Sequence, residues 1–487
     1  MAFAAASSAI VIGLSGHPVR IEARLSPGGH GFHLTGLPDT TAAGIRDRVR
    51  AAIVNSGYDW PPERITVTVL PSGIPAYSSA LDVAIAVAIL AGSGKIPLKR
   101  LSHTAFLGEL GLDGAIRQIR GLSCAMRTLV TSGIRSIAIP RGHASQEIRC
   151  AVIAAGSLTE LVDRLNSDAP APAPTPSDST RGPALDLTDL PGNHAARHAL
   201  EVCAAGGHHL LLIGDGPATM LAERLPGILP PLDDASLAEV AEIYALTETP
   251  RRRRRPPLCA PHYTNTAAAI FGRHAAGRFR PGAVSLAHAG VLFLDQAPEY
   301  ARSVLDGLRM PLETGEIVLA SWQGVMSVPA RFQLLLASSP CACSGANTCR
   351  CGPVERHRYL NRLAGLRERI EIIAPIDPID CNAQPGEPSS TVADRVAAAR
   401  ARAAHRLAGT PWRTNAQIPP SELRTSHRLD ADALDPLESH LHAGALTPST
   451  LTRILRLAWT LADLRAAHRP TRDDTQHALR LWHGEPA

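Results

Sequence analysis

Four cysteines between residues 341 and 351 form the densest group of metal-ligating side chains in the sequence. They stand in a CxC-x5-CxC array made of Cys341, Cys343, Cys349 and Cys351. Cysteines this close in sequence can bring four thiolates around one Zn²⁺ ion in tetrahedral geometry. Gly345 and Gly352 supply turn freedom, and the neighbouring Arg350 would offset part of the negative charge of such a centre. The array predicts a structural zinc site, and the alternative is a loop with four unligated thiols.

A glycine-containing loop that follows an apolar run indicates a phosphate-binding site. The run Leu210 to Ile213 leads into Gly214-Asp215-Gly216-Pro217-Ala218-Thr219 and then a helical pattern. Such a loop holds phosphates with backbone N–H groups and a helix N-terminus, and a lysine reaches the β- and γ-phosphates. Lysine occurs only at Lys95 and Lys99, so the loop and everything after it lack one. The candidate contacts to ATP and Mg²⁺ are Gly214, Gly216, Thr219 and Asp295, and this set is incomplete.

A second apolar run, Val291 to Leu294, ends at Asp295. Nucleotide hydrolases use an acidic residue at such a strand end to hold Mg²⁺, and the next residue polarises the attacking water. Asp295 suits the metal role, but Gln296 carries a neutral amide and cannot act as a base. The two motifs together predict a nucleotide site with a damaged hydrolytic centre.

Five consecutive arginines form the strongest local concentration of charge: Arg251, Arg252, Arg253, Arg254 and Arg255. One interpretation of this run is a solvated surface loop, and the other is a loop that contacts DNA phosphates. The histidines His208, His209 and His262 have no acidic or thiol partner at ligand spacing. We therefore interpret these histidines as structural residues or as neighbours of a nucleotide.

The elements that position these residues fall into three segments and a linker. Residues 1–165 alternate short β-branched runs with Ala-rich helical patterns, which predicts a compact α/β or α+β unit. Residues 166–184 contain a Pro/Ala/Ser run typical of a linker. Residues 185–375 contain the loop, both apolar runs and the cysteines. Residues 376–487 have helical periodicity, clearest at Leu451 to Leu464 and Asp473 to Trp482.

Length and composition limit the class of protein. The 487 residues are 45% apolar, enough for two or three hydrophobic cores. The net charge of +5 is too small for nucleic-acid binding over the whole surface but permits a local basic face. The longest apolar run is interrupted by Asp82 and falls short of the roughly 18 residues that span a bilayer. The scattered cysteines favour a reducing compartment, so we expect a cytoplasmic protein without a membrane partner.

Several longer runs have the pattern of a known family. In the second segment they are Gly206-Gly207-His208-His209-Leu210, Leu225-Pro226-Gly227-Ile228-Leu229-Pro230-Pro231-Leu232, Ser285-Leu286-Ala287-His288, Leu294-Asp295-Gln296-Ala297-Pro298-Glu299 and the cysteine cluster. In the first segment they are Gly36-Leu37-Pro38-Asp39, Arg48 to Gly57 and Ser79-Ala80-Leu81-Asp82. Over nearly its whole length the chain resembles the Mg-chelatase-like AAA+ ATPases of the ComM (YifB) type.

This resemblance implies an α/β protein of three parts. The first would have the Lon-protease-like fold, also called ribosomal S5 domain 2-like, the second an AAA+ P-loop-type α/β fold, and the third a helical lid. It also implies a bacterial cytoplasmic protein that forms a homo-hexamer or a mixed AAA+ ring. The family is linked to DNA branch migration and to the uptake of transforming DNA, so DNA is an expected partner.

Departures from the family pattern affect the ATPase parts. Against the family's GPPGxGKT loop the chain is two residues shorter, and Ala218 stands at the lysine position. Gln296 replaces a glutamate and Ser339 replaces a sensor asparagine. The C-terminal sensor arginine falls on Ser449 or Thr450, whereas Arg369 remains as a candidate finger arginine.

The remnants of the catalytic set are thus Asp295, Gln296 and Arg369, and we expect impaired or absent ATPase activity. The alternatives are a working branch-migration motor with an unconventional loop and a non-catalytic modulator of an active AAA+ partner. Mutational decay of the gene would produce the same losses.

The first segment shows a parallel loss. The Lon-like fold pairs a nucleophilic serine with a lysine, and Ser79 falls at the serine position, but Ser123 stands where the lysine would be. A serine without a base is an ordinary hydroxyl, so peptidase activity is not expected. The interpretation without catalysis is that Ser79 caps the helix containing Asp82 to Leu90.

Overall fold

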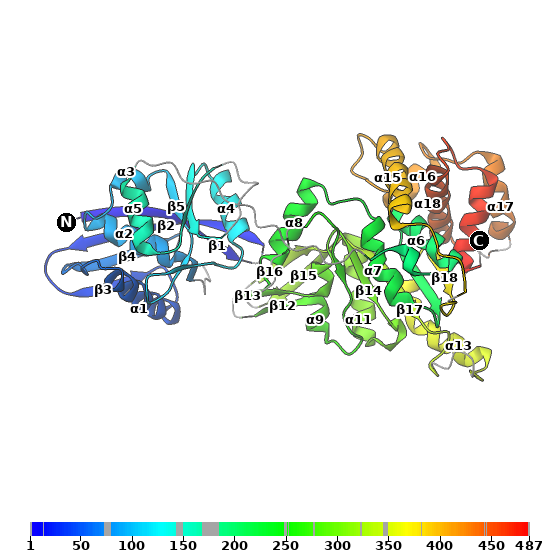
Figure 1. The fold of residues 1–487 in the computed structure, drawn as a ribbon, viewed down its shortest axis with the longest axis horizontal. Helices are drawn as coiled ribbons and strands as arrows, with labels where there is room; N and C mark the ends of the chain where they lie inside the picture. Colours follow the sequence, from blue (N-terminus) through cyan, green and yellow to red (C-terminus); the bar gives the residue numbers. More distant parts are fainter. Residues whose placement is uncertain are drawn as a thin grey trace.

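The computed structural model describes residues 2–12, 14–72, 79–142, 150–167, 185–247, 251, 253–275, 278–321, 324–343, 349–380, 382–442, 444 and 446–485. Figure 1 shows three consecutive groups along the long axis: an N-terminal sheet with helices, a parallel sheet with helices, and a C-terminal group of helices. The mixed α/β class predicted from the sequence is confirmed. Of the expected linker, residues 168–184 lie outside the described residues. None of the described helices has the length and apolar character needed to cross a membrane.

The N-terminal group is built on a seven-stranded sheet in the order β3-β4-β2-β1-β5-β8-β9. The strands are β1 (Ala2–Ile12), β2 (Ser15–Ser26), β3 (Gly31–Thr35), β4 (Arg64–Leu70), β5 (Thr104–Phe106), β8 (Ser136–Pro140) and β9 (Ala151–Ala155), and the short strands β6 (Glu109–Leu110) and β7 (Ile116–Arg117) pair separately. β1 and β2 pair along their whole length as an antiparallel hairpin. Alternation of buried and exposed residues along β2 and β4 places one face of the sheet on a core.

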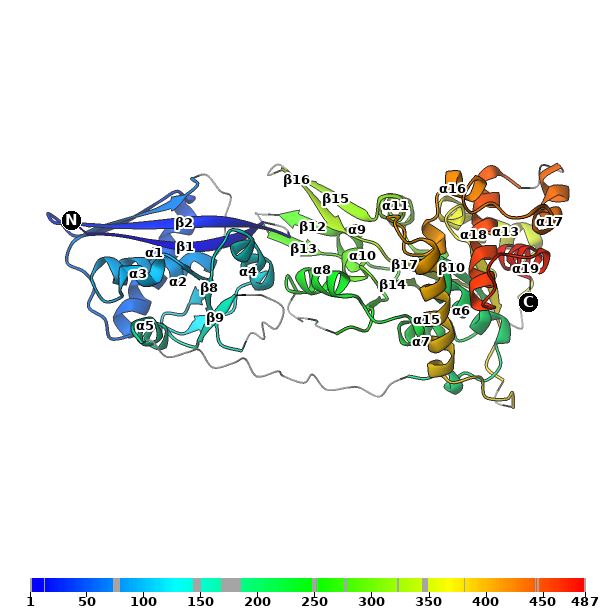
Figure 2. The same ribbon diagram turned by 90° about the horizontal axis from the view of Figure 1, so that it is seen from above.

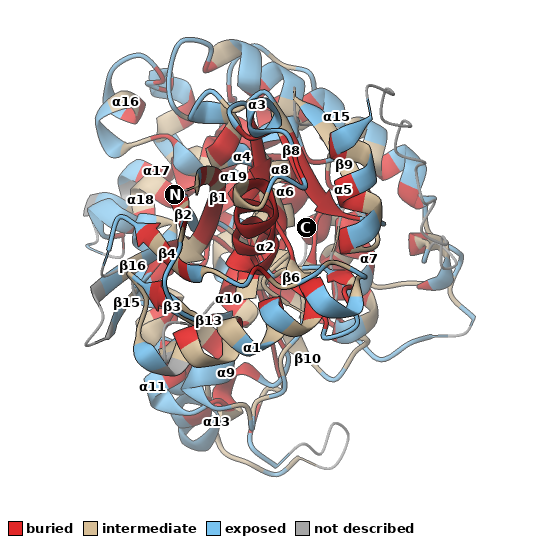
Figure 3. Ribbon diagram, turned by 90° about the vertical axis from the view of Figure 1, so that its left-hand side faces the viewer, coloured by how far each residue is buried: buried red, intermediate tan, exposed pale blue. Residues whose placement is uncertain are grey.

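Five helices pack around this sheet: α1 (Asp39–Asn55), α2 (Asp82–Gly92), α3 (Leu98–Leu101), α4 (Leu122–Thr131) and α5 (Leu158–Asn166). α2 is apolar on every side after Asp82 and is buried almost throughout, as Figure 3 shows. The Asp82 carboxylate accepts two hydrogen bonds from the Arg48 guanidinium of α1, at 2.8 and 3.1 Å. Burial nevertheless raises the pKa of Asp82 to about 6.

The middle group contains a five-stranded sheet in the order β11-β14-β17-β10-β18, with every pairing parallel. Its strands are β10 (Leu210–Gly214), β11 (Leu258–Cys259), β14 (Val291–Leu294), β17 (Gln333–Ser338) and β18 (Ile372–Ile376). The two apolar runs predicted as strands are thus β10 and β14. β17 lies between them, so both motifs end at the same carboxyl edge of the sheet. Ligands of open parallel sheets bind outside this edge.

Helices and hairpins surround the parallel sheet. The helices are α6 (His194–Gly206), α7 (Ala218–Ile228), α8 (Asp234–Tyr244), α9 (Ala267–Phe271), α10 (Ala283–Leu286), α11 (Arg302–Gly307), α12 (Arg309–Thr314), α13 (Pro353–Leu360) and α14 (Ala364–Arg367). The hairpins pair β12 (Gly272–Ala275) with β13 (Arg278–Pro281) and β15 (Glu316–Ser321) with β16 (Gly324–Pro329). Both hairpins lie toward the N-terminal group (Figure 2). That group also contacts α8, because Arg127 pairs with Glu242 at 2.5 Å and Gly121 N–H bonds Ala245 O at 3.3 Å.

The C-terminal group consists of α15 (Ser389–Arg406), α16 (Pro420–Arg424), α17 (Ala431–His442), α18 (Pro448–Leu464) and α19 (Arg472–His483). α18 and α19 confirm the two regions where the helical pattern is clearest. The buried Asp463 of α18 pairs with Arg406 of α15 at 2.6 Å. One hydrophobic cluster joins these helices to α6, α7 and one face of the parallel sheet. The C-terminal helices therefore share their core with the sheet.

Candidate nucleotide and metal sites

The phosphate-loop motif and the acidic strand end meet at the carboxyl edge of the parallel sheet. β10 delivers the loop residues to this edge and α7 begins at Ala218. The Thr219 hydroxyl donates a hydrogen bond to the Asp295 carboxylate, with 3.3 Å between Oγ1 and Oδ2. Both side chains are exposed. A hydroxyl and a carboxylate in this arrangement offer two oxygen ligands of the kind that Mg²⁺ prefers.

The two loop glycines are required by packing against the end of β18. Gly214 has φ +148°, and a β-carbon there would lie 2.0 Å from the carbonyl oxygen of Ile376. A β-carbon on Gly216 would lie 2.4 Å from the carbonyl oxygen of Asp377. Both contacts are far shorter than any van der Waals distance between carbon and oxygen. Packing alone therefore requires glycine at both positions, whether or not the loop binds a phosphate.

Within the shortened loop, a backbone N–H group bonds to the loop's own carbonyl. The Ala218 N–H, at the position after Pro217, donates to the Gly216 carbonyl at 2.9 Å, and Pro217 has no N–H to offer. The Ala218 methyl is buried in the core beneath α7. Two of the backbone groups that could hold a phosphate are thus absent or already bonded, and the residue at the lysine position is part of the core.

The other residues expected to be catalytic remnants are distributed over two edges of the sheet. Gln296 and Ser339 follow β14 and β17 and lie at the carboxyl edge, where the backbone of Gln296 is left-handed with φ +49°. Arg369 precedes β18 and therefore lies at the opposite, amino edge, where it pairs with Glu313 of α12. Ser449 belongs to α18 and accepts a hydrogen bond from Arg453 at 2.8 Å. Within one chain, the structure brings Thr219 and Asp295 together but does not bring Arg369 to them.

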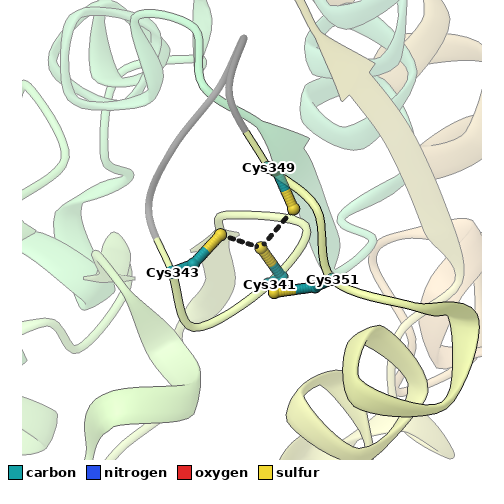
Figure 4. Close-up of side chains that lie close together, drawn as sticks. All are labelled: Cys341, Cys343, Cys349 and Cys351. Atoms are coloured by element: carbon teal, nitrogen blue, oxygen red, sulfur yellow. Dashed lines mark hydrogen bonds between the residues drawn. The ribbon is translucent and has the colours of Figure 1, made fainter.

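The four cysteines converge just after β17 (Figure 4). Their sulfur atoms all lie within 4.8 Å of one another, with Cys341 Sγ 2.8 Å from Cys343 Sγ and 3.1 Å from Cys349 Sγ. Zn–S bonds of about 2.3 Å in a tetrahedron would separate the sulfurs by about 3.8 Å. The distances between the sulfurs therefore need to change by about 1 Å at most, some lengthening and others shortening, to surround a zinc ion. The donor set and its spacing fit Zn²⁺.

A basic residue that the sequence analysis did not consider adjoins this cluster. The Arg356 guanidinium of α13 donates to Cys349 Sγ at 3.7 Å, and both Arg356 and Arg350 are exposed. A hydrogen bond from Cys341 lowers the pKa of Cys349 to about 6, so this thiol readily supplies a thiolate. Arg356 follows Cys351 by five residues on a helix, a spacing that gave no signal in the sequence. Gly345, the other supporting residue expected in this loop, lies outside the described residues.

The arginine run is partly bound to its own surroundings. Arg251 lies over the Tyr244 ring, 5.8 Å from its centroid, and donates to the carbonyl of Arg255 at 2.9 Å. Arg254 pairs with Asp234 of α8 at 2.6 Å. Arg253 and Arg255 are exposed, and Arg252 lies outside the described residues. Free solvation therefore does not describe Arg251 or Arg254.

The conspicuous histidines have structural surroundings. His208 is fully buried with Nε2 2.8 Å from the Thr460 hydroxyl of α18, and burial lowers its pKa to about 3. The Nδ1 atom of His209 accepts from the Leu334 N–H at 3.0 Å. His262 bonds the nearby Thr264 hydroxyl at 2.8 Å. Within the described ranges, the four cysteines are the one cluster of three or more side chains placed to hold a metal.

Ser79 has a partner that sequence reasoning missed. Its hydroxyl donates to the Glu109 carboxylate at 2.6 Å, at the start of a short 3-10 helix, Ser79–Leu81, ahead of α2. The residue that precedes α2 is Leu81, and it makes no side-chain cap, so the interpretation of Ser79 as a helix cap is wrong. Ser123, at the expected lysine position, lies on α4. Sequence separation of 30 residues between Ser79 and Glu109 concealed the pair.

These features define a class: a mixed α/β chain whose parallel sheet carries a glycine-containing loop, as in AAA+ type domains. Residues 21–143 match the family described as subunit ChlI of Mg-chelatase. Residues 186–383 match magnesium chelatase, subunit ChlI, and residues 386–481 match the C-terminal part of that subunit. The chain belongs to this Mg-chelatase ChlI family, as its sequence motifs predicted.

Full-length relatives agree with this assignment. Uncharacterized protein Rv2897c of Mycobacterium tuberculosis is 41% identical over 496 aligned positions, which cover 98% of each chain. YifB of Escherichia coli is 34% identical and the competence protein ComM of Haemophilus influenzae is also 34% identical. Each of these alignments covers 96% of this chain and 94% of the relative. The predicted resemblance to the ComM and YifB group is confirmed.

Proposed function

We propose that this protein acts in DNA processing as a ComM-like, cytoplasmic member of its family with weak or absent ATP turnover. The observation that supports this most directly is the carboxyl edge of the parallel sheet. Thr219 and Asp295 stay paired there, but the lysine position is a buried alanine and the base position is Gln296. Loss of a positioned cation from a phosphoryl-transfer site typically costs several kcal/mol of barrier, so hydrolysis falls to background.

The proposed architecture has a Lon-like unit at 1–165, a linker at 166–184, an AAA+ unit at 185–375 and a helical lid at 376–487. We propose a hexameric ring as the working assembly. The opposite placement of Arg369 and the loop supports this, because a finger arginine at the amino edge can reach a phosphate only on a neighbouring subunit.

Isothermal titration of the purified chain with Mg-ATP tests the proposal. We expect affinity far weaker than micromolar and no hydrolysis above background, with or without branched DNA. The matched comparison is a variant with the full GKT loop restored and Gln296→Glu, which should regain binding if the site is otherwise intact. Tight Mg-ATP binding by the unaltered chain, or hydrolysis stimulated by branched DNA, would instead establish a working motor with an unconventional loop.

A second candidate, a modulator of an active AAA+ partner in a mixed ring, is favoured by one observation. Arg369 is retained and held in place by Glu313 even though this chain's own loop is eroded. A subunit of this kind could supply a finger to an active neighbour without hydrolysing ATP itself. Co-purification with an ATPase of the same fold, and a loss of that partner's turnover with Arg369→Ala, would support this role. A partner rate that Arg369→Ala leaves unchanged would exclude it.

A further inference from the structure

A large cleft lies at the amino edge of the parallel sheet, on the side away from the phosphate-loop motif. Its volume is about 1280 Å³. The floor is formed where strands begin, at His209, Gln333 and Glu371, and the opposite wall comes from α15, α16 and α18. Pockets for small molecules usually measure about 300 to 1,000 Å³, so this cleft can hold a ligand of nucleotide size or larger.

Three arginines line this cleft: Arg400 of α15 and Arg453 and Arg456 of α18. Arg453 also lies over the Trp482 ring, 5.2 Å from its centroid. Each donates one hydrogen bond: Arg400 to the Ala204 carbonyl, Arg453 to the Ser449 hydroxyl, and Arg456 to the Ile418 carbonyl, all at 2.8 Å. Arg453 is only 6% exposed. Among the residues that the structure describes, none of the three forms an ion pair. Each guanidinium has five N–H groups, so most of their donor capacity is unused.

Five carboxylates line the cleft, and four of them are committed to other partners, Asp233 by accepting the Ser236 N–H at 2.8 Å. The fifth, Glu368, attracts Arg453 electrostatically. Glu239 pairs with His288 at 2.8 Å, and Glu313 pairs with Arg369. Glu371 accepts the backbone N–H of His209 at 2.9 Å. Glu371 attracts Arg453 and Arg456 electrostatically, but burial outweighs this attraction and lowers the pKa of both, and it lowers the pKa of Arg400 to about 10. Arg453 is buried and Arg400 and Arg456 are half-buried. Cations held away from water without a paired anion are costly, so the cleft is electrostatically complementary to a negative ligand.

We propose that this cleft is a binding site for a phosphate-bearing anion, held by the guanidinium groups of Arg400, Arg453 and Arg456. Arginine forks match phosphate oxygens in pairs and form the stronger, charge-assisted class of hydrogen bond. Two further exposed arginines, Arg413 and Arg424, line the cleft and would contact a longer ligand. Within one chain the site lies on the opposite edge of the sheet from Thr219 and Asp295, so it does not need ATP at this chain's own loop. Arg369 and Ser449 line the same cleft, so in the proposed ring it would face a neighbouring subunit, and to that extent the inference rests on the proposed function.

Inorganic tripolyphosphate without Mg²⁺ is the probe, with binding followed by isothermal titration and by the rise in melting temperature of the full chain. We expect saturable binding that weakens by about tenfold or more in Arg453→Gln/Arg456→Gln. The matched control is Arg302→Gln/Arg358→Gln, which removes the same charge from exposed positions on α11 and α13. Arg424→Gln separates binding from folding, because Arg424 is exposed. We expect this variant to bind tripolyphosphate about threefold more weakly with an unchanged melting temperature.

A labelled DNA single strand of about 20 nucleotides, longer than a typical single-strand site, distinguishes the sources of phosphate. If tripolyphosphate displaces the strand and the cleft variants lose both ligands, the site takes a nucleic-acid backbone. If tripolyphosphate binds without displacing the strand, the site takes a soluble polyphosphate such as a nucleotide tail. The proposal is overturned if tripolyphosphate does not bind, if the cleft and control variants bind it equally, or if Thr219→Val rather than the cleft variants abolishes binding.

Discussion

The cysteine cluster and the phosphate-loop motif both lie after parallel strands of the same sheet, but only one of them keeps a full set of ligands. All four thiols point toward one another, and no hydrophobic packing accounts for the exposed Cys343. The loop retains Gly214 and Gly216, which the close approach of β18 requires in any case, and has lost the lysine, which packing does not require. Gly214 and Gly216 therefore have a packing role whether or not the loop binds a phosphate, and only residues without such a role indicate the chemistry of a motif.

The largest effect that tests this comparison is expected when the metal is removed from the cysteine cluster. We expect about one Zn²⁺ per chain, and none after Cys341→Ser or Cys351→Ser, because three thiolates without the fourth bind zinc much more weakly. Elemental analysis of chelator-treated protein measures the metal. Cys150→Ser, in the N-terminal group, is the control that should keep the zinc. A chain without zinc, with all four cluster thiols reacting freely, would leave the cluster without a ligand role.

The packing role of the loop glycines predicts a large loss of stability. Gly214→Ala should lower the free energy of unfolding by about 2 to 4 kcal/mol even without nucleotide, because its β-carbon meets the Ile376 carbonyl. Gly133→Ala is a matched control, with φ +87° but no atom within 4 Å of the added carbon, and should cost about 1 kcal/mol. Urea unfolding of both variants measures the difference. Equal losses would mean that backbone conformation, and not contact with β18, retains Gly214.

A smaller effect is expected at His208, which belongs to one of the family-like runs but is placed as a packing residue. The unfolded chain protonates this histidine below about pH 6.5, whereas the folded chain keeps it neutral to about pH 3. The unfolded state thus binds more protons in this window, and stability falls with decreasing pH by up to about 1.4 kcal/mol per pH unit.

His208→Gln should reduce the pH slope of the unfolding free energy by one proton, because the glutamine cannot titrate. His30→Gln, at an exposed position of the N-terminal group, serves as the control. Denaturant titrations between pH 4 and 7 at roughly half-unit steps resolve the slope. The same slope in the native chain and in His208→Gln would show that His208 is not held neutral by burial.

The smallest expected effect concerns the arginine run, where packed and exposed members can be separated. If the exposed residues contact DNA, Arg253→Ala/Arg255→Ala should flatten the slope of log K against log salt by up to about 1.8, or about 0.9 per phosphate. Arg251→Ala should instead lower the melting temperature through the lost contact with Tyr244. Fluorescence anisotropy over roughly 50 to 200 mM salt measures the slopes. Unchanged slopes in the double variant would identify the run as a surface loop without a DNA role.

The sequence alone determined the elements that depend on local pattern. The apolar runs that become β10 and β14, the helical periods of α18 and α19 and the cysteine spacing all correspond to structure. These succeed because strand alternation, helical period and short ligand spacing are properties of neighbouring residues. The missing lysine is equally certain from sequence, since a residue type absent after Lys99 is absent from every site built later in the chain.

Only the tertiary structure decided which distant residues meet. It placed Arg369 on the opposite edge from Thr219, gave Ser79 the carboxylate of Glu109, and set Arg356 beside Cys349. It also joined the C-terminal helices to the sheet in one core and so formed the arginine-lined cleft between them. These contacts join residues that strand order and helix packing bring together across the chain, and no local pattern contains that information. The sequence indicated the loop glycines as phosphate ligands, because it does not show that β18 lies against them. The structure shows that they also pack against the end of β18.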